Sequence, residues 1–139
     1  MASSNDLPDR VPAGWTLQTH GDTFSGRAGP FYFHAGDGPG VGFLSEPRHA
    51  NVGGMIHGGA LLTLADMSLW DICRRAAGPF KAVTLTMNAE FIAPGPIGRF
   101  IHATGEALRI GRSVMFARGE VRCGDARLLA FSGSLKRLG

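Results

Sequence analysis

The segment His57-Gly58-Gly59 has the residue types of a site that acts on a carbonyl group. It directly precedes residues 60–77, a run without Gly or Pro that is rich in Ala, Leu and Met and is expected to form a helix. The first backbone N–H groups of a helix lack an intrahelical partner and carry the positive end of the helix dipole. Glycine also lets a ligand approach the backbone closely. Such a helix start suits the oxyanion that forms when a carbonyl is attacked, although a Gly-Gly pair taken by itself more often marks a loop end with a surface histidine.

Asp66 is the candidate acid–base group on this helix. At about 100° per residue it lies at the edge of the apolar arc, one turn from Leu62 and one turn from Trp70. The helix would carry this carboxylate toward the interior or an interface, where desolvation raises a pKa and makes a useful base. A structural aspartate bonded to a backbone group or an arginine explains the position equally well. Asp71, in contrast, is predicted to be a solvated surface charge. The expected apolar arc consists of Leu61, Leu62, Ala65, Leu69, Ile72, Cys73 and Ala76, and the opposite polar face of Ser68, Asp71 and Arg75.

The spacing of His57, Asp66 and Asn51 in the sequence strengthens the interpretation that they form one site acting on a carbonyl group. Asp66 follows His57 by nine residues, a little over two helical turns, and Asn51 precedes His57 by six. A thioester carbonyl could meet the N–H donors at the helix start while the carboxylate addresses its carbon, either along the groove or from another subunit.

Several other kinds of site are not expected. The chain has no Walker lysine pattern and no G-x-S-x-G elbow, and the glycines of residues 36–42 do not have dinucleotide-binding spacing. The five histidines form no ligand cluster, so neither a metal nor another cofactor is predicted. The net charge is +3, but the twelve arginines are scattered and not interleaved with aromatic residues, so nucleic acid is not an expected partner.

The chain length of 139 residues predicts one domain over residues 13–139, preceded by a flexible arm over residues 1–12. No apolar run approaches the roughly 18 residues of a membrane span, and the arm has no signal-peptide pattern. A cytoplasmic protein without a membrane partner is therefore expected. Cys73 and Cys123 are predicted to be reduced core residues.

The remaining elements are predicted mostly as strands. Residues 81–93 alternate, with Val83, Leu85, Met87, Ala89 and Phe91 on one face and Thr84, Thr86, Asn88 and Glu90 on the other. Runs at 99–110, 112–123 and 126–137 follow after short Gly-containing gaps, which predicts a four-stranded antiparallel meander. A hairpin is expected from residues 31–34 and 41–46. One long buried helix beside one antiparallel sheet is an α+β two-layer domain.

Residues 51–66, NVGGMIHGGALLTLAD, resemble the signature of the PaaI-type hotdog-fold acyl-CoA thioesterases. In that family an Asn precedes an HGG that opens the long central helix, and LAD or LVD supplies the acidic residue. Residues 83–94 are similar to the strand that follows the helix and ends in a Pro-containing turn. The resemblance covers residues 28–138 and implies a hotdog fold, in which a curved antiparallel sheet of five or six strands wraps one helix.

The resemblance also implies roles for individual residues. Asp66 would be the general base or the nucleophile, the Gly58 N–H would polarise the thioester carbonyl, and Asn51 and His57 would position the carbonyl or water. Thr84 falls where some members carry a Ser that holds the water, although Thr84 is equally a plain strand former. The residues implied at the phosphates of coenzyme A are Arg109, Gly111, Arg112, Ser113 and Arg137, whereas Lys136 is expected to be an ordinary surface charge.

The implied reaction is hydrolysis of an acyl-CoA to a carboxylic acid and CoA, without a metal or other cofactor. The family's sites form across a dimer interface, so a homodimer or homotetramer is expected, with Asp66 and Thr84 contributed by different subunits. Two alternatives stay open. One is a non-catalytic acyl-CoA-binding hotdog protein, and the other is a hotdog dehydratase or hydratase, although the acid and His pattern of the latter is not found.

Overall fold

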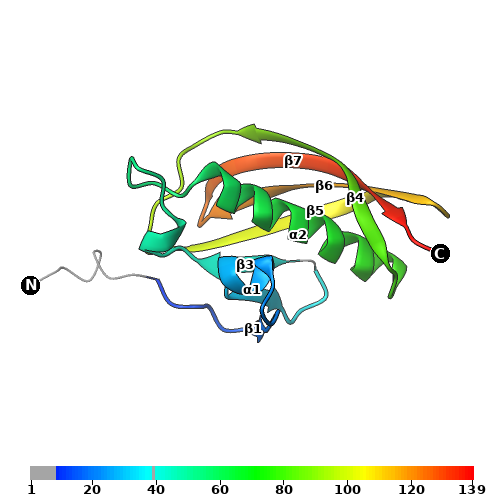
Figure 1. The fold of residues 1–139 in the computed structure, drawn as a ribbon, viewed down its shortest axis with the longest axis horizontal. Helices are drawn as coiled ribbons and strands as arrows, with labels where there is room; N and C mark the ends of the chain where they lie inside the picture. The colour runs from blue at the N-terminus through cyan, green and yellow to red at the C-terminus, as the bar shows by residue number, and fades with distance from the viewer. Residues whose placement is uncertain (1–8, 39) are drawn as a thin grey trace, which may run out of the picture.

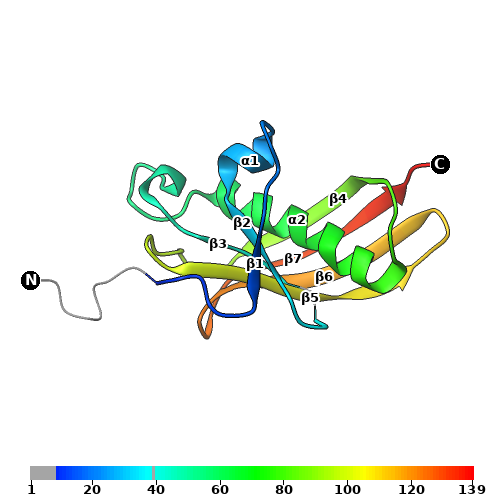
Figure 2. The same ribbon diagram turned by 90° about the horizontal axis from the view of Figure 1, so that it is seen from below.

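A computed structural model describes residues 9–38 and 40–139. The strands are β1 (Trp15–Gln18), β2 (Phe31–His34), β3 (Val41–Leu44), β4 (Ala82–Phe91), β5 (Phe100–Ile110), β6 (Val114–Cys123) and β7 (Ala126–Arg137). The helices are α1 (Phe24–Ala28) and α2 (Gly58–Ala77), with a 3-10 turn at Pro47–His49. All strands form one antiparallel sheet in the order β1-β2-β3-β5-β6-β7-β4. The sheet curves around α2 (Figure 1, Figure 2), so the predicted α+β hotdog fold is confirmed, with seven strands instead of five or six.

The helix α2 packs closely on the sheet because two sheet residues facing it are glycines. A Cβ atom at Gly105 would lie 2.6 Å from Ile72 Cδ1, and one at Gly133 would lie 2.5 Å from Leu69 Cδ1. Leu69 and Ile72 are buried, as the predicted apolar arc requires, and so are Leu61, Ala65 and Cys73. Leu62 is only half-buried and Ala76 is exposed. Both cysteines are free and buried, as predicted, and burial raises the pKa of each thiol.

The predicted four-stranded meander is wrong at its first strand. β5, β6 and β7 are joined by short turns and pair in sequence, but β4 pairs with β7 and occupies the sheet edge. The connection after β4 is too long for a hairpin and leads from the sheet edge past β7 and β6 to β5, in the middle of the sheet. On its way it binds two earlier segments, because Gly95 O accepts from Ile56 N at 2.8 Å and Gly98 N donates to Ser45 O at 2.9 Å.

A β-bulge in β4 also breaks the predicted alternation. Thr84 pairs with Leu135 and Thr86 with Ser134, which leaves Leu85 without an opposite residue. Beyond the bulge the faces exchange. Met87 therefore packs against the core on the same side as Thr84, whereas Thr86 bonds Ser134 through its hydroxyl at 2.7 Å. The uninterrupted alternation had placed Thr84 and Met87 on opposite faces.

Part of the predicted arm, residues 1–8, lies outside the described residues. Asp9 is bound to the start of β5. Its N–H donates to Gly98 O at 2.7 Å, and its carboxylate accepts from Arg99 Nε at 2.8 Å and from Phe100 N at 2.9 Å. These bonds lower the pKa of the Asp9 carboxyl.

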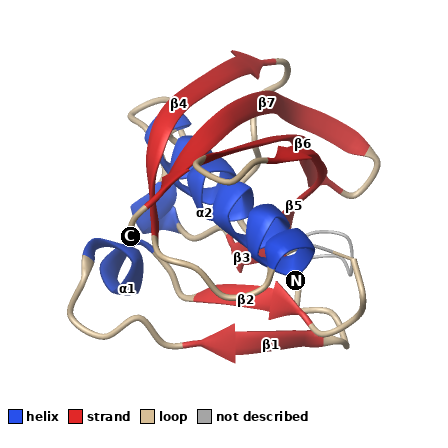
Figure 3. Ribbon diagram, turned by 90° about the vertical axis from the view of Figure 1, so that its right-hand side faces the viewer, coloured by secondary structure: helices blue, strands red, loops and turns tan. Residues whose placement is uncertain are grey.

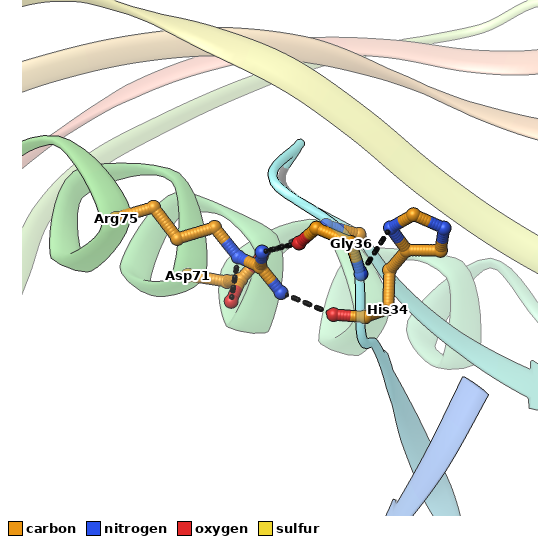
Figure 4. A network of polar contacts seen from close by, with 5 residues as sticks. His34, Gly36, Asp71 and Arg75 are labelled. Carbon is orange, nitrogen blue, oxygen red and sulfur yellow. Dashed lines mark hydrogen bonds and ion pairs between the residues drawn. The ribbon is translucent and has the colours of Figure 1, made fainter. Parts of the chain in front are cut away.

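The expectation that Asp71 is a solvated charge is wrong. Its side chain is buried, because the turn between β2 and β3 folds over this part of α2. Asp71 accepts from Gly40 N at 2.9 Å and from Arg75 Nε at 3.1 Å. Arg75 in turn donates to the carbonyl oxygens of Gly36 at 2.7 Å and His34 at 2.6 Å (Figure 4). Ser68, also predicted on the polar face, is buried and donates to Leu64 O at 2.8 Å.

We expect Asp71→Ala to lower the free energy of unfolding by about 2–3 kcal/mol, because it leaves the buried Gly40 N–H and the Arg75 guanidinium without their acceptor. Urea denaturation at fixed protein concentration measures this as a lower midpoint with an unchanged slope. Asp37→Ala, at an exposed position of the same turn, is the control and should change stability by less than about 0.5 kcal/mol. Equal midpoints for Asp71→Ala and wild type would show that this network does not tie the turn to the helix.

Candidate active site

Asp66 on α2 and Thr84 on β4 meet within one chain, so the expectation that different subunits contribute them is wrong. The Thr84 hydroxyl donates to Asp66 Oδ1 at 2.7 Å. Asp66 is exposed in this chain, although its position on the helical wheel predicted that it points toward the interior or an interface. Asp71, which was predicted to be solvated, is the buried one of the two. The pair borders a hollow of about 440 Å³. Its lining residues are Gln18, His20, Phe33, Asp66, Met67, Trp70, Ala82, Thr84 and Leu135.

The start of α2 has the groups that the sequence predicted for it. His57 is the N-cap residue, with extended backbone, and its Nδ1 accepts the Gly59 N–H at 2.8 Å. Because Nδ1 is an acceptor, the neutral ring carries its proton on Nε2, which is left to donate. The Gly58 N–H has no acceptor among residues 9–38 and 40–139. Two donors are thus available at the positive end of the helix.

Asn51 holds the loop before α2. Its Oδ1 accepts from Gly53 N at 2.9 Å and from Met55 N at 3.2 Å, so its amide NH₂ is the part free for a ligand. A second anchor of this loop, His49, was not predicted. Its carbonyl accepts the His57 N–H at 2.8 Å, and its buried ring bonds Ala28 O at 2.6 Å and Glu46 N at 3.0 Å. Burial lowers the pKa of His49, which keeps the ring neutral in this role.

The predicted catalytic residues border two separate hollows of the single chain. Asn51 and Gly58 line one of about 410 Å³, together with Phe91 of β4. Asp66 and Thr84 line the 440 Å³ hollow. Gly58 and Asp66 are eight residues apart on one helix, which corresponds to about 12 Å along its axis. One chain therefore does not bring the carboxylate to the N–H donors.

The residues predicted for the phosphates of CoA gather at one end of the sheet. Gly111 closes the turn between β5 and β6 through its N–H to Val114 O at 3.0 Å. Arg109, Arg112 and Ser113 are exposed there. The backbone of Arg137 is joined to this turn, because its N–H donates to Ser113 O at 2.8 Å.

The two basic residues at the end of β7, Lys136 and Arg137, have different surroundings. The guanidinium carbon of Arg137 lies 6.0 Å from the Phe80 ring centroid, and the Arg137 Nε is buried without a hydrogen-bond partner. Lys136 is exposed and donates to Ser113 Oγ at 3.4 Å. Lys136 is thus exposed at the surface, as expected.

One wall of the Asp66 hollow was not predicted from the sequence, namely the wall formed by Gln18, His20 and Phe33. They come from the segment spanning β1 and β2, which lies on the opposite side of α2 from β4 (Figure 3). No local pattern near Asp66 signals this contact. His20 packs against Phe31 and Phe33, with ring centroids 6.3 and 6.2 Å away.

The sequence predicts neither a metal site nor a membrane-spanning helix. Within residues 9–38 and 40–139, no three His, Cys, Asp or Glu residues are close enough together to hold a metal ion. Over the same described part of the chain, no helix combines the length and the hydropathy needed to cross a membrane.

Comparison with known proteins places the chain in a family. Residues 53–130, which include the helix start, Asp66 and Thr84, match the model of the thioesterase superfamily. The chain belongs to this superfamily. Human acyl-coenzyme A thioesterase 13 is 29% identical over 99 residues, which cover 68% of this chain and 68% of the human protein.

Solved structures agree with this assignment. A mutant structure of the phenylacetic acid degradation protein PaaI from Thermus thermophilus is 26% identical, with a TM-score of 0.72, covering 84% of this chain and 100% of that one. A Bacillus halodurans protein solved with CoA is 25% identical, with a TM-score of 0.66, covering 71% of this chain and 66% of that one. The resemblance of this thioesterase to PaaI-type hotdog proteins is thus confirmed.

Proposed function

We propose that this thioesterase hydrolyses acyl-CoA, taking up water and releasing a carboxylic acid and CoA. The observation that carries the proposal is the Asp66 carboxylate, oriented by the 2.7 Å bond from Thr84 and open to a hollow large enough for an acyl group. Membership of the thioesterase superfamily and the likeness to an acyl-coenzyme A thioesterase support the choice of a CoA thioester.

In the proposed mechanism Asp66 acts at the carbonyl carbon in one of two ways. As a general base it takes a proton from water, which then adds to the carbon and displaces the CoA thiolate. As a nucleophile it forms a mixed anhydride, releases CoA and is regenerated by water. In both routes Thr84 donates to one carboxylate oxygen, which leaves the second oxygen to face the substrate.

The oxyanion is assigned to the start of α2. The Gly58 N–H and the His57 Nε2–H would donate to the carbonyl oxygen, and the Asn51 amide would position the carbonyl or the water. Since these groups and Asp66 border different hollows of one chain, we assign them to two chains of a homodimer. Arg109, Gly111, Arg112, Ser113 and Arg137 are assigned to the nucleotide of CoA. Arg109 and Arg112 are exposed cations of the turn, and Arg137 joins this turn to the end of β7, where Leu135 borders the Asp66 hollow.

The surface of β4 supports an assembly of this kind. β4 is an edge strand of ten residues, and its outer edge is unpaired within the described sheet. Four large apolar side chains on β4 and just beyond it are about half exposed, namely Val83 (47%), Leu85 (50%), Phe91 (55%) and Ile92 (52%). A second copy of the chain would cover them, and the Phe91 that lines the Gly58 hollow would then lie at the interface.

A mixing experiment tests the function and the shared site together. Asp66→Asn and Gly58→Pro, each nearly inactive alone, are unfolded, mixed in equal amounts and refolded. Thiol release from acyl-CoA should recover to about a quarter of the wild-type rate, because half of the dimers are mixed and each of those has one intact site of two.

The matched control mixes Asp66→Asn with the double variant that carries both substitutions on one chain. This mixture forms no intact shared site and should stay inactive. Without recovery in the first mixture, the site would have to lie within one chain.

Failure of wild type on every ester of a panel (phenylacetyl-, hydroxybenzoyl-, hexanoyl- and palmitoyl-CoA) would favour a non-catalytic acyl-CoA-binding protein or a different thioester reaction. The dehydratase or hydratase alternative would then be examined with enoyl- and hydroxyacyl-CoA. The family match favours hydrolysis over both alternatives.

A further inference from the structure

The hollow at Asp66 does not end at Trp70. A second hollow of about 430 Å³ adjoins it and continues toward the carboxyl end of α2. The two hollows share three lining residues, Gln18, Phe33 and Trp70. Arg74 and Arg75 line the second hollow. The lining residues come from α2 and from the β1–β2 pair, which lie next to each other in Figure 3. A substrate group that starts at Asp66 can therefore extend along these residues to the last turn of the helix.

Three residues of α2 mark this path. Asp66, Trp70 and Arg74 follow one another at intervals of four, so they lie along one stripe of the helix. The eight steps from Asp66 to Arg74 span about 12 Å of the helix axis. The guanidinium carbon of Arg74 lies 5.7 Å from the centroid of the Trp70 ring. The Arg74 charge is thus folded back over the indole toward Asp66, which is the direction that helical side chains take.

Of the two arginines that line the second hollow, Arg74 is the one whose charge is not paired with a described carboxylate. Arg75 is bound to the Asp71 carboxylate and to two carbonyl oxygens, so those two opposite charges neutralise each other. Arg74 forms no ion pair with any residue of the described ranges 9–38 and 40–139. One positive charge therefore remains at the far end of a path whose middle is mostly apolar, since Phe33, Met67 and Trp70 line it beside Gln18.

We propose that the acyl group of the preferred substrate carries an anion at its far end, so that the substrate is a CoA monothioester of a medium-length dicarboxylic acid. The thioester lies at Asp66, the methylene chain passes over Trp70, and the terminal carboxylate meets the Arg74 guanidinium in a charge-assisted hydrogen bond. A plain fatty acyl chain of the same length would put its methyl end against this cation and desolvate the guanidinium without a partner. The inference rests on the proposed thioesterase function of Asp66.

The test compares suberoyl-CoA with octanoyl-CoA, which have eight acyl carbons each and differ in the terminal carboxylate. We expect wild type to prefer suberoyl-CoA, and Arg74→Gln to lose about tenfold in kcat/KM for suberoyl-CoA, with octanoyl-CoA changed less than about twofold. Arg74→Lys should recover part of the loss, because it restores the charge without the planar donor pair.

Arg118→Gln is the matched control. It removes the same charge from β6, where Arg118 is exposed and paired with Glu106, and should affect both esters equally and slightly. An equal loss on both esters in Arg74→Gln would overturn the proposal in favour of a phosphate of CoA as the anion at Arg74. No loss on either ester would also overturn it and leave Arg74 a surface cation. If wild type hydrolysed neither ester nor any of the wider panel, the proposed function itself would fail and this inference with it.

Discussion

Replacing Asp66 by asparagine is expected to lower kcat for acyl-CoA hydrolysis by about 10³-fold, within the range that removal of a general base or nucleophile produces. Asparagine has nearly the same shape, and its Oδ1 can still accept the Thr84 hydroxyl that now lies 2.7 Å from Asp66 Oδ1. The substitution therefore removes the negative charge and the basicity with little change of geometry. Thiol release measured with saturating acyl-CoA gives kcat directly.

The control for this variant is Asp125→Asn, which removes a carboxylate from the exposed turn between β6 and β7. It should retain activity within about twofold of wild type. Circular dichroism and the elution volume on gel filtration must match wild type for both variants. If Asp66→Asn kept the wild-type rate, Asp66 would be the structural residue that its wheel position also allowed.

The second large effect is expected at Gly58, where proline removes an N–H that the helix itself does not use. Gly58 is the first residue of α2, a position at which proline is favoured because its missing N–H has no intrahelical partner. The preceding residue, His57, already has φ −60° and ψ 136°, the extended conformation that a following proline requires. We expect Gly58→Pro to lower kcat by about 10²–10³-fold, the loss typical of one oxyanion donor.

Gly58→Ala separates the lost N–H from the added bulk. A Cβ at this position would lie 3.2 Å from the Phe91 ring, so both variants introduce this Cβ contact, and proline adds the rest of its ring. Alanine keeps the N–H, and its activity should stay within a few-fold of wild type, with a similar thermal unfolding midpoint for the two variants. Equal losses in alanine and proline variants would assign the effect to Phe91, and an active proline variant would remove Gly58 from the oxyanion site.

The two expected losses of kcat come from Asp66 and Gly58, which lie about 12 Å apart along the axis of α2. For this reason the proposed site needs one group from each of two chains. In a single chain Asp66 and Gly58 border different hollows. Two inactive variants can restore each other only when each contributes the group that the other lacks. The exposed apolar residues of β4 provide a surface on which such a second chain can pack.

Local features of the sequence were enough to predict α2, the β2–β3 hairpin and the strands β4 to β7, but not β1 or α1. The run without Gly or Pro after His57-Gly58-Gly59 predicts α2 within two residues of its observed start, and Gly78 ends it with φ 80°. Glycine-containing turns predict the β5–β6 and β6–β7 hairpins, because two-strand pairing across a short turn is a local interaction. The resemblance singled out Asp66 and Thr84 but assigned them to different subunits, so their hydrogen bond within one chain became apparent only in the folded structure.

Tertiary contacts alone decided the environment of each site residue. The helical wheel predicted that Asp66 points inward and that Asp71 is solvated. In the structure Asp66 is exposed and Asp71 is buried, because Gly40, 31 residues before Asp71, donates its N–H to the Asp71 carboxylate. The bulge at Leu85 turns Thr84 and Met87 to the same face. The Gln18 and Phe33 wall of the hollow comes from strands across α2.

A sequence pattern with a period of 3.6 or 2 therefore identifies the long helix and most of the strands, because backbone geometry sets those periods. Such a pattern does not indicate which distant segment packs against a given face of the helix or strand. Burial, the edge position of β4 and the path from Asp66 to Arg74 depend on contacts between segments far apart in the chain, and only the folded structure determines them.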